Sequence, residues 1–255
     1  RGEVGEARRW FGRLQEAGVR PNVFSWTSLV GAYARVGDLE EAMRVLEGMR
    51  ESGCQPNEVT YLVLIDCAAK KERAELAEGW VRDMVGAGLP VKVEHVVALM
   101  DARVRSKILE GVRECWKWLL GGNWPGAPRP STSHCVDEAA ACVYLDAMGR
   151  LSDYGELEST WKELHRLPDF AVAMNQKASY VEALLRLGEV GPALRIVEEW
   201  GEEGDNVKIG VTLLGGLSSR LGRKEAGESF DRCTKGWRDA TKEEVKDIVG
   251  RGRKG

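Results

Sequence analysis

A five-residue pattern returns along the chain at a fixed interval. Residues 18–22 read GVRPN and residues 53–57 read GCQPN, 35 residues later, and an apolar, helix-compatible stretch follows each of them. An internal period between about 20 and 50 residues is typical of repeat architectures, in which each repeat is one supersecondary unit that stacks on its neighbours. The recurrence therefore limits the possible folds before any single element is assigned.

The recurrence includes the residues between the two copies of the pattern. Residues 1–22 match only the second half of a unit, so we expect a half repeat there. When residues 23–57 are aligned with residues 58–92, core-type residues meet core-type residues: the matched pairs are Trp26 with Tyr61, Leu29 with Leu64, Val30 with Ile65, Ala42 with Ala77, Met49 with Met84, and Gly53 with Gly88.

Each unit is predicted to be a pair of amphipathic helices, because apolar residues recur at intervals of three and four on both sides of Gly37-Asp38. Gly37 can adopt the left-handed conformation that ends a helix, and Asp38 can cap the next one. Gly53 and Pro56 end the second helix, since proline cannot continue it. A hairpin of this size cannot bury its apolar face alone. We therefore predict an all-α fold, a right-handed α-solenoid of stacked helical hairpins.

The domain organisation follows from how well the period persists. We expect better-defined repeats over residues 1–120, the last of them a degenerate unit at 93–120. The Gly, Pro and Ser content of residues 121–134 marks a loop or insertion. Degenerate hairpins are expected over residues 135–250, ending in a short helix, and a basic tail over residues 251–255.

Composition is that of a folded protein, with 43% hydrophobic and 30% charged residues. No run approaches the roughly 18 consecutive apolar residues that span a bilayer. The chain starts at Arg1 in helix-like sequence. We therefore expect that the natural protein begins upstream and that any targeting peptide lies outside these residues.

Catalytic and metal-binding patterns are missing from the sequence. Six cysteines are scattered without Cys-x-x-Cys pairs, which favours free thiols in a reducing compartment. His134, Cys135 and Cys142 are imaginable metal ligands, but a fourth ligand at suitable spacing is absent, and buried core thiols explain the cysteines better. No phosphate loop, dinucleotide fingerprint or deaminase motif occurs. We expect no enzymatic activity, no cofactor and no metal. Trp124, in the Gly/Pro loop, is available to contact a partner.

Residues 23–57, VFSWTSLVGAYARVGDLEEAMRVLEGMRESGCQPN, resemble a pentatricopeptide repeat. Trp26 stands where that family has Tyr, Ala42 stands at its small packing position, and Pro56-Asn57 close the repeat. Residues 58–92 depart from the pattern, since Glu72 replaces the turn Gly and Val91-Lys92 replace Pro-Asn. Tetratricopeptide repeats are the nearest confusable family, but the 35-residue period and the Gly-x-x-Pro-Asn ending favour the pentatricopeptide repeat.

This resemblance implies binding of single-stranded RNA, with one base read per repeat by two or three side chains. In the family, the second residue of a repeat packs against the base, and the fifth and last residues contact its edge. These positions are Phe24, Thr27 and Asn57, with Val59 of the next repeat on the other side of the base. The Thr/Asn combination resembles the family's adenine-preferring pair. The matching pair in the second repeat, Leu62 and Lys92, lacks this pattern, so base reading is expected at one site.

A row of cations recurs with the same period. Arg35, Lys70 and Arg105 are each 35 residues apart, and Arg186 and Arg220 precede later repeat breaks. In the family this position lies near the RNA phosphates, and single-strand binding requires such a row. Stabilisation of helix C-termini by cations is the alternative explanation.

The net charge of −3 is unfavourable for nucleic-acid binding, but it averages over several surfaces. Residues 23–36 contain no acidic side chain, whereas the helix that follows carries Glu40, Glu41, Glu47 and Glu51. If first helices line the concave side, the groove is less acidic than the chain as a whole.

Two functions are consistent with these features. The first is an RNA-binding pentatricopeptide repeat protein for organellar RNA processing, stability or translation, with a mitochondrial location expected from the family and a chloroplast location as the alternative. The second is a protein scaffold of the same fold within a mitochondrial ribosome or other ribonucleoprotein assembly, without base reading.

Overall fold

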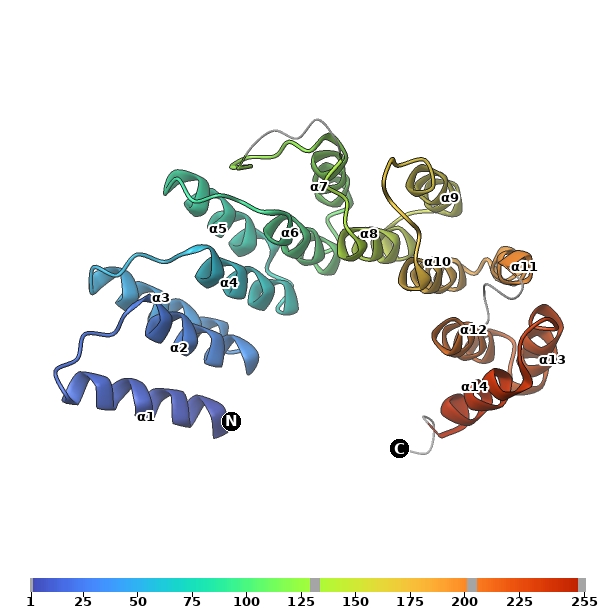
Figure 1. Cartoon of the computed structure of the whole chain (residues 1–255), viewed down its shortest axis with the longest axis horizontal. Coiled ribbons are helices and arrows are strands. Elements are labelled where there is room, and N and C mark those ends of the chain that lie inside the picture. The colour runs from blue at the N-terminus through green and yellow to red at the C-terminus, as the bar shows by residue number, and fades with distance from the viewer. Residues whose placement is uncertain (1, 129–133, 201–205, 252–255) are drawn as a thin grey trace. The chain divides into compact units, whose positions relative to one another are not determined.

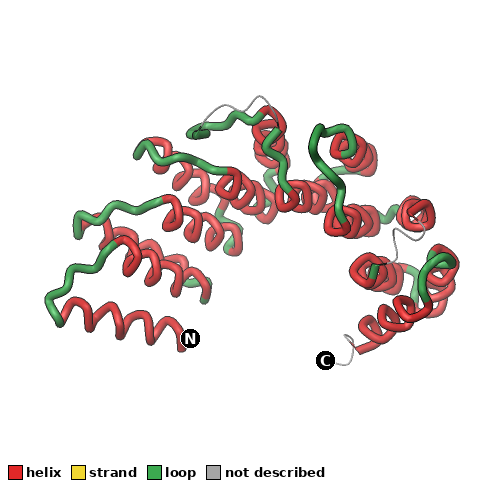
Figure 2. Tube along the Cα trace, viewed as in Figure 1, coloured by secondary structure: helices red, strands yellow, loops and turns green. Residues whose placement is uncertain are grey.

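The computed structural model describes residues 2–128, 134–200 and 206–251, and these ranges contain fourteen α-helices and no strand (Figures 1 and 2). The predicted all-α solenoid of stacked hairpins is confirmed. Contacts divide the chain into two compact units, Arg1–Cys135 and Val136–Gly255. Residues 129–133 of the predicted loop and 252–255 of the predicted basic tail lie outside the described ranges.

The helices of the first unit are α1 (Gly2–Glu16), α2 (Val23–Arg35), α3 (Leu39–Glu51), α4 (Glu58–Lys70), α5 (Ala74–Gly86), α6 (Val93–Arg105) and α7 (Leu109–Gly121). The first helices of the hairpins, α2, α4 and α6, pack side by side as one layer. Their partners α3 and α5 each contact both the first helix before them and the one after, and α7 packs on α6. The half repeat α1 packs on α2.

Local sequence explains where these helices begin and end. The side chains of Asn22, Asp38 and Asn57 accept hydrogen bonds from backbone N–H groups in the first turns of α2, α3 and α4. The turn inside each hairpin has a left-handed residue, which is Gly37 in the first hairpin (φ 73°) but Glu72 in the second (φ 56°). The fold therefore keeps this backbone conformation where the sequence has lost its glycine.

The core of this unit includes the apolar residues matched by the 35-residue alignment. Ala42, Met49, Leu64, Ile65 and Met84 are buried almost completely, and Trp26 and Tyr61 nearly so. Burial at equivalent positions of adjacent hairpins is what stabilises a solenoid, because each hairpin covers the apolar face of the next.

Side chains near the start of the first helices also join adjacent repeats. His95, buried in the first turn of α6, accepts a hydrogen bond at Nδ1 from the Lys92 N–H (3.1 Å), so its Nε2 carries the proton and donates to the Glu58 carbonyl of the preceding first helix (3.1 Å). This ring both caps its own helix and fixes the helix before it.

The second unit consists of α8 (Glu138–Leu151), α9 (Tyr154–Leu164), α10 (Met174–Leu187), α11 (Val190–Trp200), α12 (Val207–Arg220), α13 (Arg223–Cys233) and α14 (Asp239–Arg251). Helices α8, α10, α12 and α14 pack in that order as a layer of first helices. The final helix is not the short element expected, because its thirteen residues equal the length of α2 and it packs on α12 as a further first helix.

A glutamine in the second unit repeats the arrangement seen at His95. Gln176 is buried in the first turn of α10, where its Oε1 accepts from the Ala173 N–H (2.9 Å) and its Nε2 donates to the Glu138 carbonyl of α8 (3.1 Å). Different side chains at the same helix position therefore make the same two bonds.

The expectation that Trp124 is available to a partner is wrong. Its side chain is only 7% exposed, and its Nε1 donates to the Val91 carbonyl at 2.7 Å. The Val91 N–H in turn donates to the Gly126 carbonyl (2.8 Å). The Gly/Pro loop after α7 thus folds back onto the connection between α5 and α6, and Trp124 is part of the packing there.

Candidate nucleic-acid interface

Thr27 and Asn57, predicted from the sequence to act together, meet at one buried residue. Asn57 is the N-cap of α4, and its Oδ1 accepts from the Thr60 N–H (3.0 Å) and from the Thr60 hydroxyl (2.9 Å). The Thr60 Oγ1 also lies 2.7 Å from the Thr27 Oγ1 on α2. Because α2 packs against α4, residues 30 positions apart form one continuous hydrogen-bonded chain.

The predicted apolar contacts on either side of a base are both open to solvent. Phe24 is 80% exposed and Val59 is 55% exposed, and each is the second residue of its first helix. Scattered exposed apolar residues are normal on any protein surface. These two stand at equivalent positions of the adjacent helices α2 and α4, and exposed apolar side chains are a kind of surface on which a planar ring can stack.

The corresponding positions of the second repeat lack these features. Leu62 is half-buried and offers no polar group, and the Lys92 ammonium is ion-paired with Glu58 at 2.5 Å. The hydrogen bond to Glu58 raises the pKa of Lys92. The Lys92 side chain is therefore already engaged by Glu58 of the preceding first helix. Together, Leu62 and Lys92 lack the hydroxyl and amide that would discriminate between base edges.

All five predicted cations lie in the last turn of a first helix. Arg35, Lys70, Arg105 and Arg186 are each the thirteenth residue of their helices, whereas Arg220 is the fourteenth of α12. The one-residue shift changes the role of Arg220, whose guanidinium donates to the Arg186 carbonyl at 2.7 Å and so caps α10.

Acidic residues accompany this cation row, one turn earlier on the same helices. Asp101 binds Arg105 at 2.8 Å, and Arg186 is bound by Glu182 at 2.5 Å and by Asp146 of α8. Asp66 precedes Lys70 by four residues, and partial loss of hydration raises the pKa of its carboxyl. Acidic side chains therefore stand close to the cations of α6 and α10 and one turn before the cation of α4, whereas α2 has no acidic residue.

Sequence spacing missed one member of the row. Arg150 is the thirteenth residue of α8 and is bound to Asp146 at 2.7 Å, as Arg105 is to Asp101. The insertion between α7 and α8 breaks the 35-residue count, so the residue is found only by counting from the start of its own helix. Thr60 was missed as well, because it is fully buried and touches no surface that a family pattern describes.

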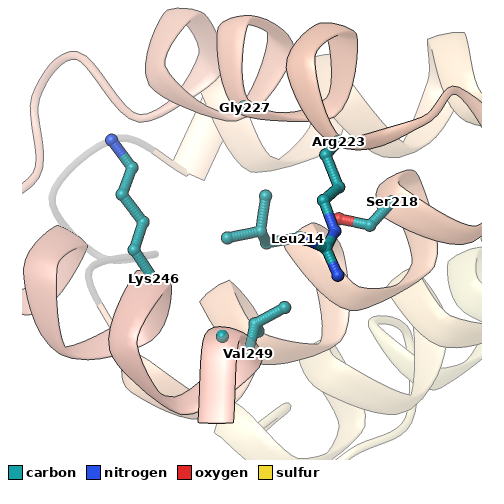
Figure 3. Close-up of a pocket in the computed structure, with 7 residues that line it drawn as sticks. Leu214, Ser218, Arg223, Gly227, Lys246 and Val249 are labelled. Carbon is teal, nitrogen blue, oxygen red and sulfur yellow. The ribbon is translucent and has the colours of Figure 1, made fainter. Parts of the chain in front are cut away.

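Of two hollows in the described part of the second unit, only one is lined by residues of the cation row. One of about 280 Å³ lies among α12, α13 and α14, where Arg223 and Ser218 lie on one side of Leu214 (Figure 3). Lys246 on its other side is ion-paired with Asp231 at 2.6 Å. None of the predicted site residues lines this hollow. Another hollow, of about 380 Å³, lies between α10 and α12 and includes Arg186 and Arg220.

The cysteines are free thiols. Cys67, Cys115 and Cys233 are buried, and burial raises the pKa of Cys115 to about 11 and that of Cys233 to about 12. Thiols in such surroundings are weak nucleophiles, because the thiolate is the reactive form. Within the described ranges, no group of three or more His, Cys, Asp or Glu side chains is placed to hold a metal ion. No helix there is long and apolar enough to cross a membrane.

Comparison with known families decides the nature of these repeats. Residues 21–70 match the model of the PPR repeat family, and residues 59–89 match the model of the PPR repeat, where PPR stands for pentatricopeptide repeat. Residues 21–89 are pentatricopeptide repeats. The matched residues cover α2 to α5 and include Thr27, Asn57 and Thr60, so the hydrogen-bonded chain lies within a pentatricopeptide repeat and the start of the next.

Solved structures extend the likeness in fold beyond the matched repeats. The pentatricopeptide repeat protein PPR10 in complex with an 18-nt psaJ RNA element, and a cysteine-to-serine variant of that complex, are each 14% identical to this chain with a TM-score of 0.51. In each case 91% of this chain is covered, and it spans 38% of the length of that protein. PPR10 from maize, 15% identical, is matched over 99% of this chain and 45% of its own length with a TM-score of 0.41. No curated protein sequence matches the chain.

Proposed function

We propose that this protein binds single-stranded RNA along its first helices and reads one base between α2 and α4. The observation that carries the proposal is the hydrogen-bonded chain Thr27–Thr60–Asn57 between α2 and α4, together with the exposed apolar side chains of Phe24 and Val59 near the start of the same two helices. Stacking and edge contacts are the two elements of single-stranded RNA recognition. The RNA in the complex of PPR10 gives further support.

The phosphate contacts are proposed to include Arg35, which is exposed in the last turn of α2. Lys70, Arg105, Arg186 and Arg220 are proposed as further contacts, and Asp101, Asp146 and the C-terminus of α10 compete with RNA for three of them. A chain with net charge −3 then binds RNA through a local surface and not through its total charge.

Binding of single-stranded RNA oligonucleotides across a salt series tests the proposal. Combined Thr27→Ala and Asn57→Ala should relax selectivity between sequences while most of the affinity remains. Arg35→Ala should weaken binding about equally for all sequences and lower the slope against log salt by about 1. Arg44→Ala on α3, whose side chain is 71% exposed, is the matched control and should change neither quantity. Absence of RNA binding at moderate salt would contradict the proposal.

We further propose that the RNA is organellar, mitochondrial with chloroplast as the alternative, and that binding serves its processing, stability or translation. Support for the location comes from the family resemblance alone. Imaging of the natural full-length protein with a fluorescent tag tests it, and a cytosolic or nuclear signal would contradict it.

A protein scaffold within a mitochondrial ribosome or other ribonucleoprotein is the second candidate. The surface of the second unit favours it, because Asn175 and Lys208, each second in its first helix, bond to each other at 2.5 Å and Asn175 also bonds to Glu138. Polar side chains tied in this way offer no stacking surface. Co-purification of the tagged natural protein with ribosomal proteins after RNase treatment, without RNA affinity of the chain itself, would favour the scaffold.

A further inference from the structure

We propose that Thr60 is the positioning residue that gives the base-reading pair its donor and acceptor polarity. The inference rests on the proposed function, since it concerns how Thr27 and Asn57 discriminate a base. Thr60 has no exposed surface, so it cannot touch RNA itself. It acts through the two residues that do.

The hydrogen-bond directions follow from the chemistry of the three groups. The Asn57 atom that accepts from the Thr60 N–H is the amide oxygen, which has no hydrogen to give. The hydrogen between this oxygen and the Thr60 hydroxyl, 2.9 Å apart, therefore belongs to Thr60. A hydroxyl has one hydrogen, so the 2.7 Å contact between the Thr27 and Thr60 hydroxyls uses the hydrogen of Thr27.

These bonds fix which groups of Thr27 and Asn57 face the surface as hydrogen-bond donor and acceptor. Thr27 has given its hydrogen to Thr60 and presents only lone pairs, while Asn57 has its oxygen turned inward and presents its NH₂ group. In the described part of the chain, the Asn57 Nδ2 makes no hydrogen bond. The pair therefore offers one acceptor and one donor in a set order, which suits a base edge with an amine beside a ring-nitrogen acceptor, as in adenine and cytosine, and not the reversed edge of uracil.

Without the Thr60 hydroxyl, the donor and acceptor roles of the Thr27 hydroxyl and the Asn57 amide are no longer fixed. The Thr27 hydroxyl can rotate to donate or accept, and the Asn57 amide loses one of the two bonds that hold its oxygen inward. Such a pair accepts either polarity on a base edge, so discrimination falls while stacking and phosphate contacts persist.

The arrangement is specific to this repeat. Asn22 and Ser25 make the same cap at the start of α2, with the Ser25 N–H at 3.0 Å and its hydroxyl at 3.1 Å from the Asn22 Oδ1. In the described structure, no hydroxyl equivalent to that of Thr27 forms a hydrogen bond with Ser25 from a preceding first helix. His95 and Gln176, at the position of Thr60 in later repeats, donate instead to backbone carbonyls. Ser25 therefore provides a matched control, with the cap bond but not the link.

The test compares wild type, Thr60→Val, Thr60→Ser and Ser25→Ala by fluorescence anisotropy with labelled 14-nucleotide homopolymers of A, C and U at fixed salt. We expect wild type to prefer the A and C homopolymers to the U homopolymer, whose edge has the opposite polarity, and Thr60→Val to lose roughly tenfold of that preference, the equivalent of one edge hydrogen bond. The mean affinity and its salt slope should persist. Thr60→Ser should restore the preference, and Ser25→Ala should leave it unchanged.

A measurement without RNA separates this inference from the proposed function. The ¹⁵N relaxation of the Asn57 side-chain amide should report an ordered group in wild type and Thr60→Ser, and a mobile one in Thr60→Val. An ordered amide in Thr60→Val, unchanged discrimination, or an equal loss of affinity for all three homopolymers would overturn the role of Thr60. If wild type binds none of the homopolymers selectively, the proposed base reading fails, whereas the amide measurement still decides whether Thr60 fixes Asn57.

Discussion

At the residue scale, the hairpin turns show a conformation that persists after its preferred residue is lost. Glu72 (φ 56°) and Lys107 (φ 60°) occupy the left-handed backbone position that Gly37 (φ 73°) holds in the first hairpin, and the three are spaced by 35 residues. A non-glycine residue in this region costs about 1–3 kcal/mol. The packing of the flanking helices therefore determines the turn conformation, and Glu72 and Lys107 adopt it at a cost in folding free energy.

We accordingly expect Glu72→Gly to stabilise the protein by about 1 kcal/mol, since relief of the backbone cost exceeds the entropy that glycine adds to the unfolded chain. Thermal unfolding should show a rise of about 2–4 °C. Glu75→Gly, inside α5, is the control and should lower stability by about 1 kcal/mol, because glycine is unfavourable within a helix. A Tm for Glu72→Gly at or below that of wild type would show that the left-handed turn carries no cost.

One residue of the candidate site, Thr60, could not be predicted from the sequence pattern. Phe24, Thr27, Asn57 and Val59 were predicted because a family pattern describes residues that face the ligand. Thr60 was not, because its part depends on a 2.7 Å contact between two helices that no local pattern encodes. Periodicity gives the helix face on which a residue lies, but not which hydroxyl of one repeat meets which hydroxyl of the next.

At the element scale, the helices and their pairing were predictable, since apolar spacing and the Gly-x-x-Pro-Asn ending depend only on neighbours along the chain. The insertion after α7 was not. Its composition predicted a loop or insertion in which Trp124 is available to a partner, but Trp124 donates to the Val91 carbonyl and is part of the core. The insertion also breaks the 35-residue spacing of the cation row, so Arg150 could not be identified from that spacing. Both failures arise where contacts distant in sequence replace the repeat.

The bridge between adjacent first helices is the element-scale feature to test. His95→Ala leaves the Lys92 N–H and the Glu58 carbonyl without their partner, and the loss should be about 1–3 kcal/mol of unfolding free energy. His95→Gln should recover most of it, because Gln176 makes the same two bonds in the second unit. Chemical denaturation midpoints measure both. Equal destabilisation by glutamine and alanine would mean that packing of the ring, and not its two hydrogen bonds, supports the repeat.

At the scale of the whole molecule, the features that favour RNA reading and those that favour a scaffold are unevenly distributed. The exposed apolar pair, the Thr27–Thr60–Asn57 chain and the acid-free helix α2 all lie in the first unit, Arg1–Cys135. The second unit carries side chains already engaged with one another, such as Arg186 with Asp146 and Lys208 with Asn175. Net charge and composition, which average over both units, could not reveal this difference from the sequence.

Because repeat proteins are stabilised mainly by contacts between neighbouring repeats, a fragment of residues 1–135 should fold on its own. Circular dichroism should show a helical fragment with a cooperative melt. We expect it to retain the preference among homopolymer RNAs shown by the full chain, with weaker affinity and a smaller salt slope, because the cations of the second unit are absent. The matched fragment of residues 136–255 should bind RNA weakly and without preference. If selectivity instead resides in residues 136–255, or if neither fragment binds while both are folded, base reading between α2 and α4 is wrong.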